Sequence, residues 1–90
     1  MQHIYDELYT ISSDVLYTQR ENYLFIVKIS DDYNVFKISG TLIKVFLSFA
    51  SQGSPRAILE KLSGKEASAD DLKSISSFIE EMLKRELLAR

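Results

Sequence analysis

The residues around Gly40 constrain the fold more than any other part of the chain, because the spacing of apolar side chains changes there. Before Gly40, Phe36 and Ile38 alternate with polar residues, as on a β-strand. After Gly40 the large apolar side chains recur every three or four residues, as on a helix: Leu42, Ile43, Phe46, Phe49 and Ala50. A strand therefore continues through one glycine into a helix. What occupies the other edge of that strand becomes the main question about function.

Three stretches predict a small β-sheet. Residues 14–19 alternate modestly, residues 23–30 are almost entirely β-branched or aromatic, and residues 35–39 form the third stretch. The middle stretch is apolar on both faces, which predicts a central strand with helices on one side. The segment 31–34, rich in Asp and Asn, predicts a turn. We expect a three-stranded antiparallel meander.

Two helices are expected directly after the sheet. The first covers about residues 41–51. Ser54 and Pro55 mark the second as its N-cap and first helical residue, and Gly64 is its expected end. The apolar stripe that this second helix is expected to bury is Ile58, Leu59 and Leu62.

The third helix is expected to cover residues 68–88, a length of about 30 Å. Ser68 and Asp71 begin it in the style of a capping box. Its apolar arc is about 180° wide, more than one thin layer has to cover. Either the helix is wedged between two neighbours, or one flank with Phe78 and Met82 lines a groove.

The expected order β-β-β-α-α-α describes an α+β fold. One face of a three-stranded antiparallel sheet packs on three helices, in the general manner of a winged helix. Residues 14–90 form this domain, and residues 1–13 precede it as an irregular arm. We expect the arm to pack through its aromatic side chains, on this chain or on a second copy in a homodimer.

Composition excludes several classes of protein. The 90 residues include no cysteine, which excludes disulfides and cysteine-ligated zinc. No apolar run approaches the ~20 residues of a membrane helix, and no secretory signal begins the chain, so a cytoplasmic protein that binds no membrane is expected. The net charge is −2 and neither half has a basic excess, so nucleic acid is not an expected partner.

Catalytic chemistry is not predicted. The single histidine, His3, is interpreted as an unpartnered surface residue, and the three glycines are isolated at element boundaries. The adjacent acidic pairs are better explained by a turn, by the first turn of a helix and by a solvated helix face: Asp31-Asp32, Asp70-Asp71 and Glu80-Glu81. We expect no enzyme activity, no catalytic residue, no metal and no cofactor.

The last strand of a three-stranded meander is an edge, and it has two interpretations. A short edge strand that carries a charge such as Lys37 is protected against pairing with other chains. The alternative is β-augmentation, in which an extended peptide adds as a fourth strand. The residues alone leave both open.

The segment VFKISGTLIKVFLSFASQGSPRAILEKL, followed by an acid-rich helix ending FIEEMLKRELL, resembles the PqqD-like family of peptide-binding domains called RiPP recognition elements. The resemblance covers roughly residues 14–88. Glu86 stands where the family commonly has glycine near the end. Such domains bind the leader of a ribosomally made precursor peptide as an extra strand, with leader side chains entering a groove against the third helix. They present the core peptide to a modifying enzyme, commonly a radical S-adenosylmethionine enzyme.

Carried to this chain, the resemblance implies a non-catalytic leader-binding protein of peptide natural-product or cofactor biosynthesis. Such domains occur alone or fused to an enzyme, and the length of 90 residues leads us to expect a stand-alone protein. The resemblance also implies that the pairing strand is Asn34, Val35, Phe36, Lys37 and Ile38. The groove candidates are Ile75, Phe78, Ile79 and Met82. Lys37 and Arg85 are the candidates for reading acidic residues of the leader.

Two other classes remain as alternatives. A winged-helix DNA-binding regulator would need a basic recognition helix, and the second helix offers only Arg56 and Lys61 against Glu60. A structural module that dimerises through its aromatic arm is the other alternative.

Overall fold

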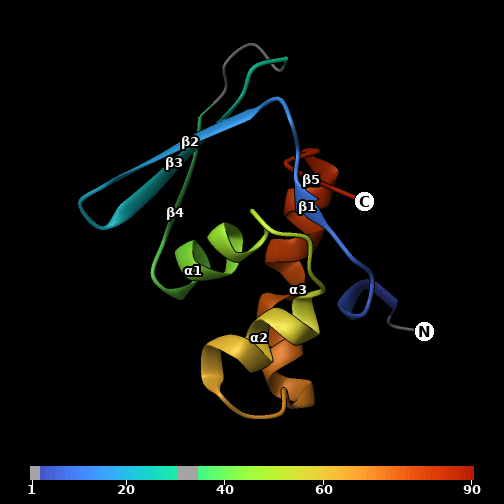
Figure 1. Ribbon diagram of the computed structural model, residues 1–90. Helices are drawn as coiled ribbons and strands as arrows, with labels where there is room; N and C mark the ends of the chain where they lie inside the picture. Colours follow the sequence, from blue (N-terminus) through green and yellow to red (C-terminus); the bar gives the residue numbers. More distant parts are fainter. Residues whose placement is uncertain (1–2, 31–34) are drawn as a thin grey trace.

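The computed structural model describes residues 3–30 and 35–90, and of His3 only the backbone. The protein is an α+β fold with a three-stranded antiparallel sheet and three helices, as the sequence predicted (Figure 1). Its elements are the 3-10 turn η1 (His3–Tyr5), strands β1 (Thr10–Ile11), β2 (Val15–Arg20), β3 (Tyr23–Lys28), β4 (Val35–Ser39) and β5 (Leu88–Ala89), and helices α1 (Thr41–Ser48), α2 (Pro55–Ser63) and α3 (Ala69–Lys84).

The main sheet has the strand order β2-β3-β4, so β3 is central, as its apolar composition predicted. Its Leu24 and Ile26 are buried on the face that meets the helices. The turn predicted at residues 31–34 lies outside the described residues. In Figure 1, β4 leads directly into α1. Gly40, which joins them, has φ of +66°, a conformation that glycine adopts at little cost.

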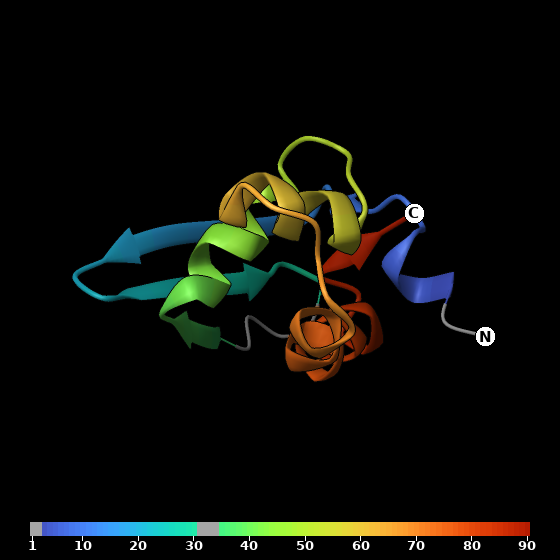
Figure 2. The same ribbon diagram turned by 90° about the horizontal axis from the view of Figure 1, so that it is seen from below.

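Helix α1 lies across one face of the sheet, as Figure 2 shows from below. The ring of its fully buried Phe46 meets Tyr17 of β2 edge-on, with 5.7 Å between the ring centroids. Helix α2 begins and ends as predicted: the Ser54 side chain accepts the N–H of Ala57 at 3.2 Å, and Gly64 ends the helix at φ of +75°.

The predicted capping box at the start of α3 is confirmed. The Ser68 hydroxyl oxygen accepts the N–H of Asp71 at 3.1 Å, and the Asp71 carboxylate accepts the N–H of Ser68 at 3.2 Å. Hydrogen bonding to the carboxylate, first from the backbone N–H of Ser68 and then from its side chain, lowers the pKa of the Asp71 carboxyl, since it favours the charged form. Among residues 3–30 and 35–90, no helix is both long and apolar enough to cross a membrane.

The end of α3 differs from the prediction. The helix stops at Lys84 after 16 residues instead of continuing to residue 88. Glu86 donates its N–H to the carbonyl of Leu83 (3.0 Å), and Leu87 donates to the carbonyl of Met82 (2.8 Å). These two bonds form a Schellman motif, which ends a helix. Glu86 has φ of +58°, where glycine is favoured, so the presence of a glutamate there concealed this stop.

The arm is not irregular, which corrects the prediction for its described residues. Its strand β1 pairs with β5 at the other end of the chain. Tyr9 is fully buried, its ring lies 6.4 Å from that of Phe49, and its backbone exchanges two hydrogen bonds with Gly53 (2.8 and 3.0 Å). The same burial raises the pKa of Tyr9. The arm is therefore part of this chain's core.

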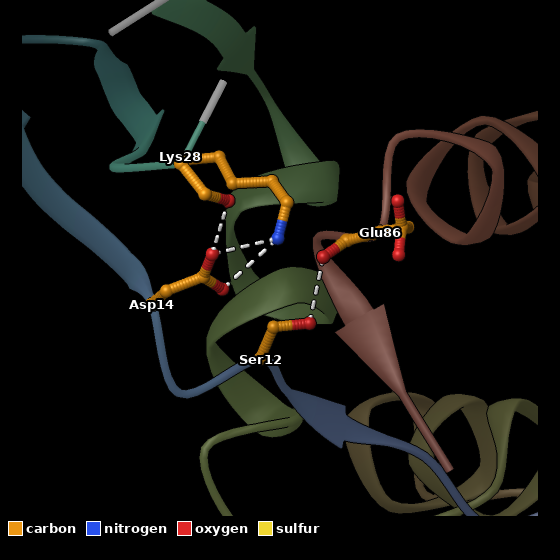
Figure 3. A network of polar contacts seen from close by, with 5 residues as sticks. Ser12, Asp14, Lys28 and Glu86 are labelled. Atoms are coloured by element: carbon orange, nitrogen blue, oxygen red, sulfur yellow. Dashed lines mark hydrogen bonds and ion pairs between the residues drawn. The ribbon is translucent and has the colours of Figure 1, made fainter. Parts of the chain in front are cut away.

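Polar contacts tie the arm, the sheet and the end of α3 together (Figure 3). Ser12 donates its hydroxyl to the carbonyl of Glu86 at 2.7 Å. The Asp14 carboxylate accepts from Lys28 at 2.8 Å and from the hydroxyl of Ser30 at 2.6 Å. Lys28 and then Ser30 are the main reasons why the pKa of Asp14 lies below its usual range. The contacts of Ser12 and Asp14 thus fix the point at which the chain passes from the arm into β2.

We expect Tyr9→Ala to lower the free energy of unfolding by about 3–5 kcal/mol, because it empties a fully buried aromatic site. Urea denaturation followed by circular dichroism measures this. The control is Leu8→Ala, one residue away and 53% exposed, which should change stability by less than about 0.5 kcal/mol. Equal effects of the two variants would show that the arm is not docked.

We expect Glu86→Gly to stabilise the protein by about 1 kcal/mol, because it relieves the positive φ at the end of α3. Glu80→Gly, at an exposed position inside the same helix, should destabilise it by about 1 kcal/mol. Thermal unfolding of the two variants and the wild type compares them. A loss of stability in both variants would contradict the Schellman geometry at Glu86.

Candidate functional site

The hydrogen-bond register of the sheet decides which backbone groups of β4 are used. Ile29 donates its N–H to the carbonyl of Asp14 (3.0 Å), in line with the β2–β3 register. Hydrogen-bonded and non-hydrogen-bonded pairs alternate along an antiparallel ladder. The odd-numbered residues of β3 therefore direct their N–H and C=O groups toward β2, and the even-numbered ones direct theirs toward β4.

This alternation leaves one row of β4 groups free. Phe36 and Ile38 lie opposite even-numbered residues of β3, so their backbone groups bond to β3. Val35, Lys37 and Ser39 direct their N–H and C=O groups away from the sheet, and we call this row the β4 edge. Within the part of the chain that the structure describes, β4 pairs with β3 alone. The β4 edge can accept another strand.

Two features indicate that α3 runs alongside β4 in the opposite direction. The guanidinium of Arg85, just after α3, lies 4.8 Å from the ring centroid of Phe36 at the start of β4. Ser74 and Ile75, in the first half of α3, line a hollow together with Thr41, which follows β4 closely. Helix α3 therefore approaches β4 near both of its ends, at Phe36 and just beyond Ser39.

The residues of α3 that were predicted to line a groove do not form an exposed surface. All four are buried, with exposed fractions of 0–9%: Ile75, Phe78, Ile79 and Met82. They hold α3 against the sheet and the other helices, which agrees with the interpretation of α3 as a helix wedged between neighbours. Ile79 and Met82 are completely buried, so a peptide could contact them only if α3 moved, whereas Ile75 lines a hollow between the helices.

The residues predicted for the pairing strand are divided between two environments. Val35 and Lys37 are exposed, Phe36 is half-buried and Ile38 is buried on the helix side. Asn34 lies outside the described residues. The structure brings Arg85 over Phe36, whereas Val35 and Lys37 point to the opposite face of β4.

The two candidate cations are held by aromatic rings on opposite faces of β4. Arg85 lies over Phe36 and also forms an ion pair with Glu81, one turn earlier. The Lys37 ammonium lies 4.5 Å from the centroid of Tyr23. Both cations are exposed. A carboxylate arriving on one side of the β4 edge would meet the Lys37 ammonium, whereas on the other side it would share Arg85 with Glu81.

The hollow beside the end of β4 was not predicted from the sequence. Its volume is about 300 Å³, and it lies between α1, α2 and α3. The residues lining this helix hollow are Thr41, Lys44, Val45, Leu59, Leu62, Ser63, Ser74 and Ile75. The sequence assigned Leu62 to the buried stripe of α2, but this side chain is 44% exposed at the rim. The sequence signal for this exposure was the position of Leu62 in the last turn of the short helix α2, where fewer neighbours cover a side chain.

The sheet also has an exposed apolar face, turned away from the helices. Leu16, Tyr23 and Val35 are 40–61% exposed on it, and Phe25 and Val27 are half-buried between them. The apolar character of β3 on both faces was the sequence signal for this surface. Side chains of an added strand would extend this face on one side and meet α3 on the other.

We expect hydrogen exchange to alternate along β4. The amides of Val35 and Lys37 should exchange with solvent much faster than those of Phe36 and Ile38, which bond to β3. Two-dimensional NMR after transfer to D₂O measures the four amides in one experiment. Strong protection of Val35 and Lys37 in the monomer would show that another group already occupies the β4 edge.

Comparison with known proteins adds no family and no relative. No protein-family model matches the chain, and neither a curated protein nor a solved structure matches it significantly. Function is therefore inferred from the geometry of the β4 edge, of α3 and of the helix hollow.

Proposed function

We propose that the protein is a non-catalytic peptide-binding protein that captures the leader of a ribosomally made precursor peptide by β-strand addition. The observation that carries this proposal is the β4 edge, where Val35, Lys37 and Ser39 direct backbone donors and acceptors away from the sheet. The proposal includes a winged-helix type of arrangement with the hairpin first, as in PqqD-like domains.

The bound leader would form a fourth strand antiparallel to β4. Main-chain hydrogen bonds would supply affinity with little demand on sequence. Alternate side chains of the leader would point toward Phe36 and Arg85 or toward Lys37 and the open face of the sheet. An acidic leader residue suits the Lys37 side, and on the other side a leader carboxylate would share Arg85 with Glu81.

The buried residues of α3 have a supporting role in this proposal. Ile79 and Met82 are completely buried, so they fix the helix that stands beside the strand. Selectivity then comes from exposed groups near the β4 edge, such as Arg85 at one end. This modifies the expectation from the family resemblance, in which the α3 side chains themselves line the groove.

Tethering is the mechanism by which binding would serve a reaction. A held leader raises the effective concentration of the attached core peptide at the active site of a modifying enzyme, to about the mM range for a short linker. The enzyme that we expect is a radical S-adenosylmethionine enzyme. This chain would supply capture and presentation, and the partner would supply the chemistry.

Two contacts favour peptide capture over the alternative classes. Arg56, one of two cations available to α2 as a recognition helix, forms an ion pair with Asp6 at 2.8 Å, which raises the pKa of its guanidinium. Tyr9, an aromatic residue of the arm expected to join two copies, is buried within its own chain. Arg56 is therefore less available for binding DNA, and Tyr9 is not available for contact with a second copy.

Replacing Val35 with proline tests strand addition, because proline removes an N–H that β3 does not use. We expect Val35→Pro to weaken peptide binding at least about tenfold in titration calorimetry, with an unchanged helical circular dichroism spectrum. The probes are synthetic peptides selected on the folded protein from a phage-displayed random library. The leader of a precursor peptide encoded beside this chain should behave in the same way.

The matched control is Gln19→Pro, which removes an outward N–H from β2, the other edge of the same sheet. Its peptide affinity should equal that of the wild type. In addition, the amides of Val35 and Lys37 should become protected from exchange when peptide binds. Normal binding by Val35→Pro, or loss of binding in Gln19→Pro alone, would remove addition at β4.

A further inference from the structure

We propose that the helix hollow is a specificity pocket that receives one large apolar side chain of the bound peptide, with Lys44 at its rim binding a neighbouring carboxylate. This inference rests on the proposed function and adds the class of peptide sequence that the protein selects. Apart from Ile75, the residues that line the hollow were not assigned by the family resemblance.

The lining of the hollow matches a side chain better than a cofactor. Its volume of about 300 Å³ is at the lower limit of small-molecule sites. Aliphatic groups form one part of the lining, and three hydroxyl side chains and one ammonium group form the rest. Leu62 is 44% exposed, so apolar surface at the rim is available to an incoming group. Covering this apolar surface with an aliphatic or aromatic side chain of the peptide would lower the free energy of the complex.

The charge of Lys44 would select the second residue of the peptide motif, an acidic residue next to the apolar one. Lys44 is the only charged residue among those lining the hollow. It is exposed, and among the residues that the structure describes it has no ion-pair partner. A peptide carboxylate next to the apolar side chain would complement this ammonium group. A basic peptide residue at that position would be repelled.

The position of the hollow sets the order of the motif in the peptide. Thr41 of the lining follows Ser39, the last residue of β4, by two positions. The hollow therefore lies beyond the Ser39 end of the β4 edge. A peptide that pairs antiparallel to β4 passes this end first. The apolar and acidic residues are thus expected on the N-terminal side of the segment that pairs with β4.

The test uses peptides selected from the same random library and compares each with an analogue in which the acidic residue is replaced by lysine. We expect the wild type to bind the acidic form about three- to fivefold more tightly, as for an exposed ion pair. Lys44→Glu should reverse this preference. Lys61→Glu, which makes the same charge change outside this hollow, should leave it unchanged.

A second variant tests the apolar half of the pocket. Ser74→Leu fills the hollow from an exposed position of α3, so it should weaken binding without loss of folding. An analogue with alanine at the apolar position should lose affinity for the wild type and little for Ser74→Leu. Unchanged preferences in both Lys44→Glu and Ser74→Leu would overturn the pocket.

The outcomes separate this inference from the proposed function. If Val35→Pro abolishes binding but Lys44→Glu and Ser74→Leu behave as the wild type does, strand addition holds and the pocket is wrong. If Lys44→Glu reverses the preference while Val35→Pro binds normally, the pocket holds and strand addition is wrong. If the library yields no peptide that binds the folded protein, both are overturned.

Discussion

The burial of α3 is the constraint on which the rest of this small fold depends. Its apolar arc is too wide for one sheet face to cover, and Ile79 and Met82 are nevertheless completely buried. Helices and sheet together cover part of this arc. The chain end also contributes, because the turn at Glu86 returns Leu87 and Leu88 to the core.

That return links the two ends of the chain. Leu88 belongs to β5, which pairs with β1 in the arm, and the arm buries Tyr9 against Phe49. A chain of this size has little core to spare, so the arm and the end of the chain add material that the sheet and helices lack. Helix α3 is therefore held firmly in place. On β4, only the backbone N–H and C=O groups of the β4 edge remain without a strand partner among the described residues.

Local signals predicted much of the fold. The caps at Ser54 and Ser68 and the stop at Gly64 depend on contacts between residues a few positions apart, so they can be recognised from sequence. The exit from α3 could not be recognised in this way, because Glu86 has the conformation expected of glycine. The pairing of β1 with β5 joins residues almost a full chain length apart, and two-residue strands carry no alternation to detect.

The sequence by itself determined the order of the three sheet strands and the three helices, the central position of β3 and the edge position of β4, because periodicity and turn residues act locally. Only the tertiary structure decided which side chains near that edge remain accessible. It buried Phe78 and Met82, which the sequence had offered as a groove, and it left Leu62 and Lys44 at the rim of a hollow. The physical reason is that helical periodicity gives the direction of an apolar face, whereas its exposure depends on every neighbour that packs against it.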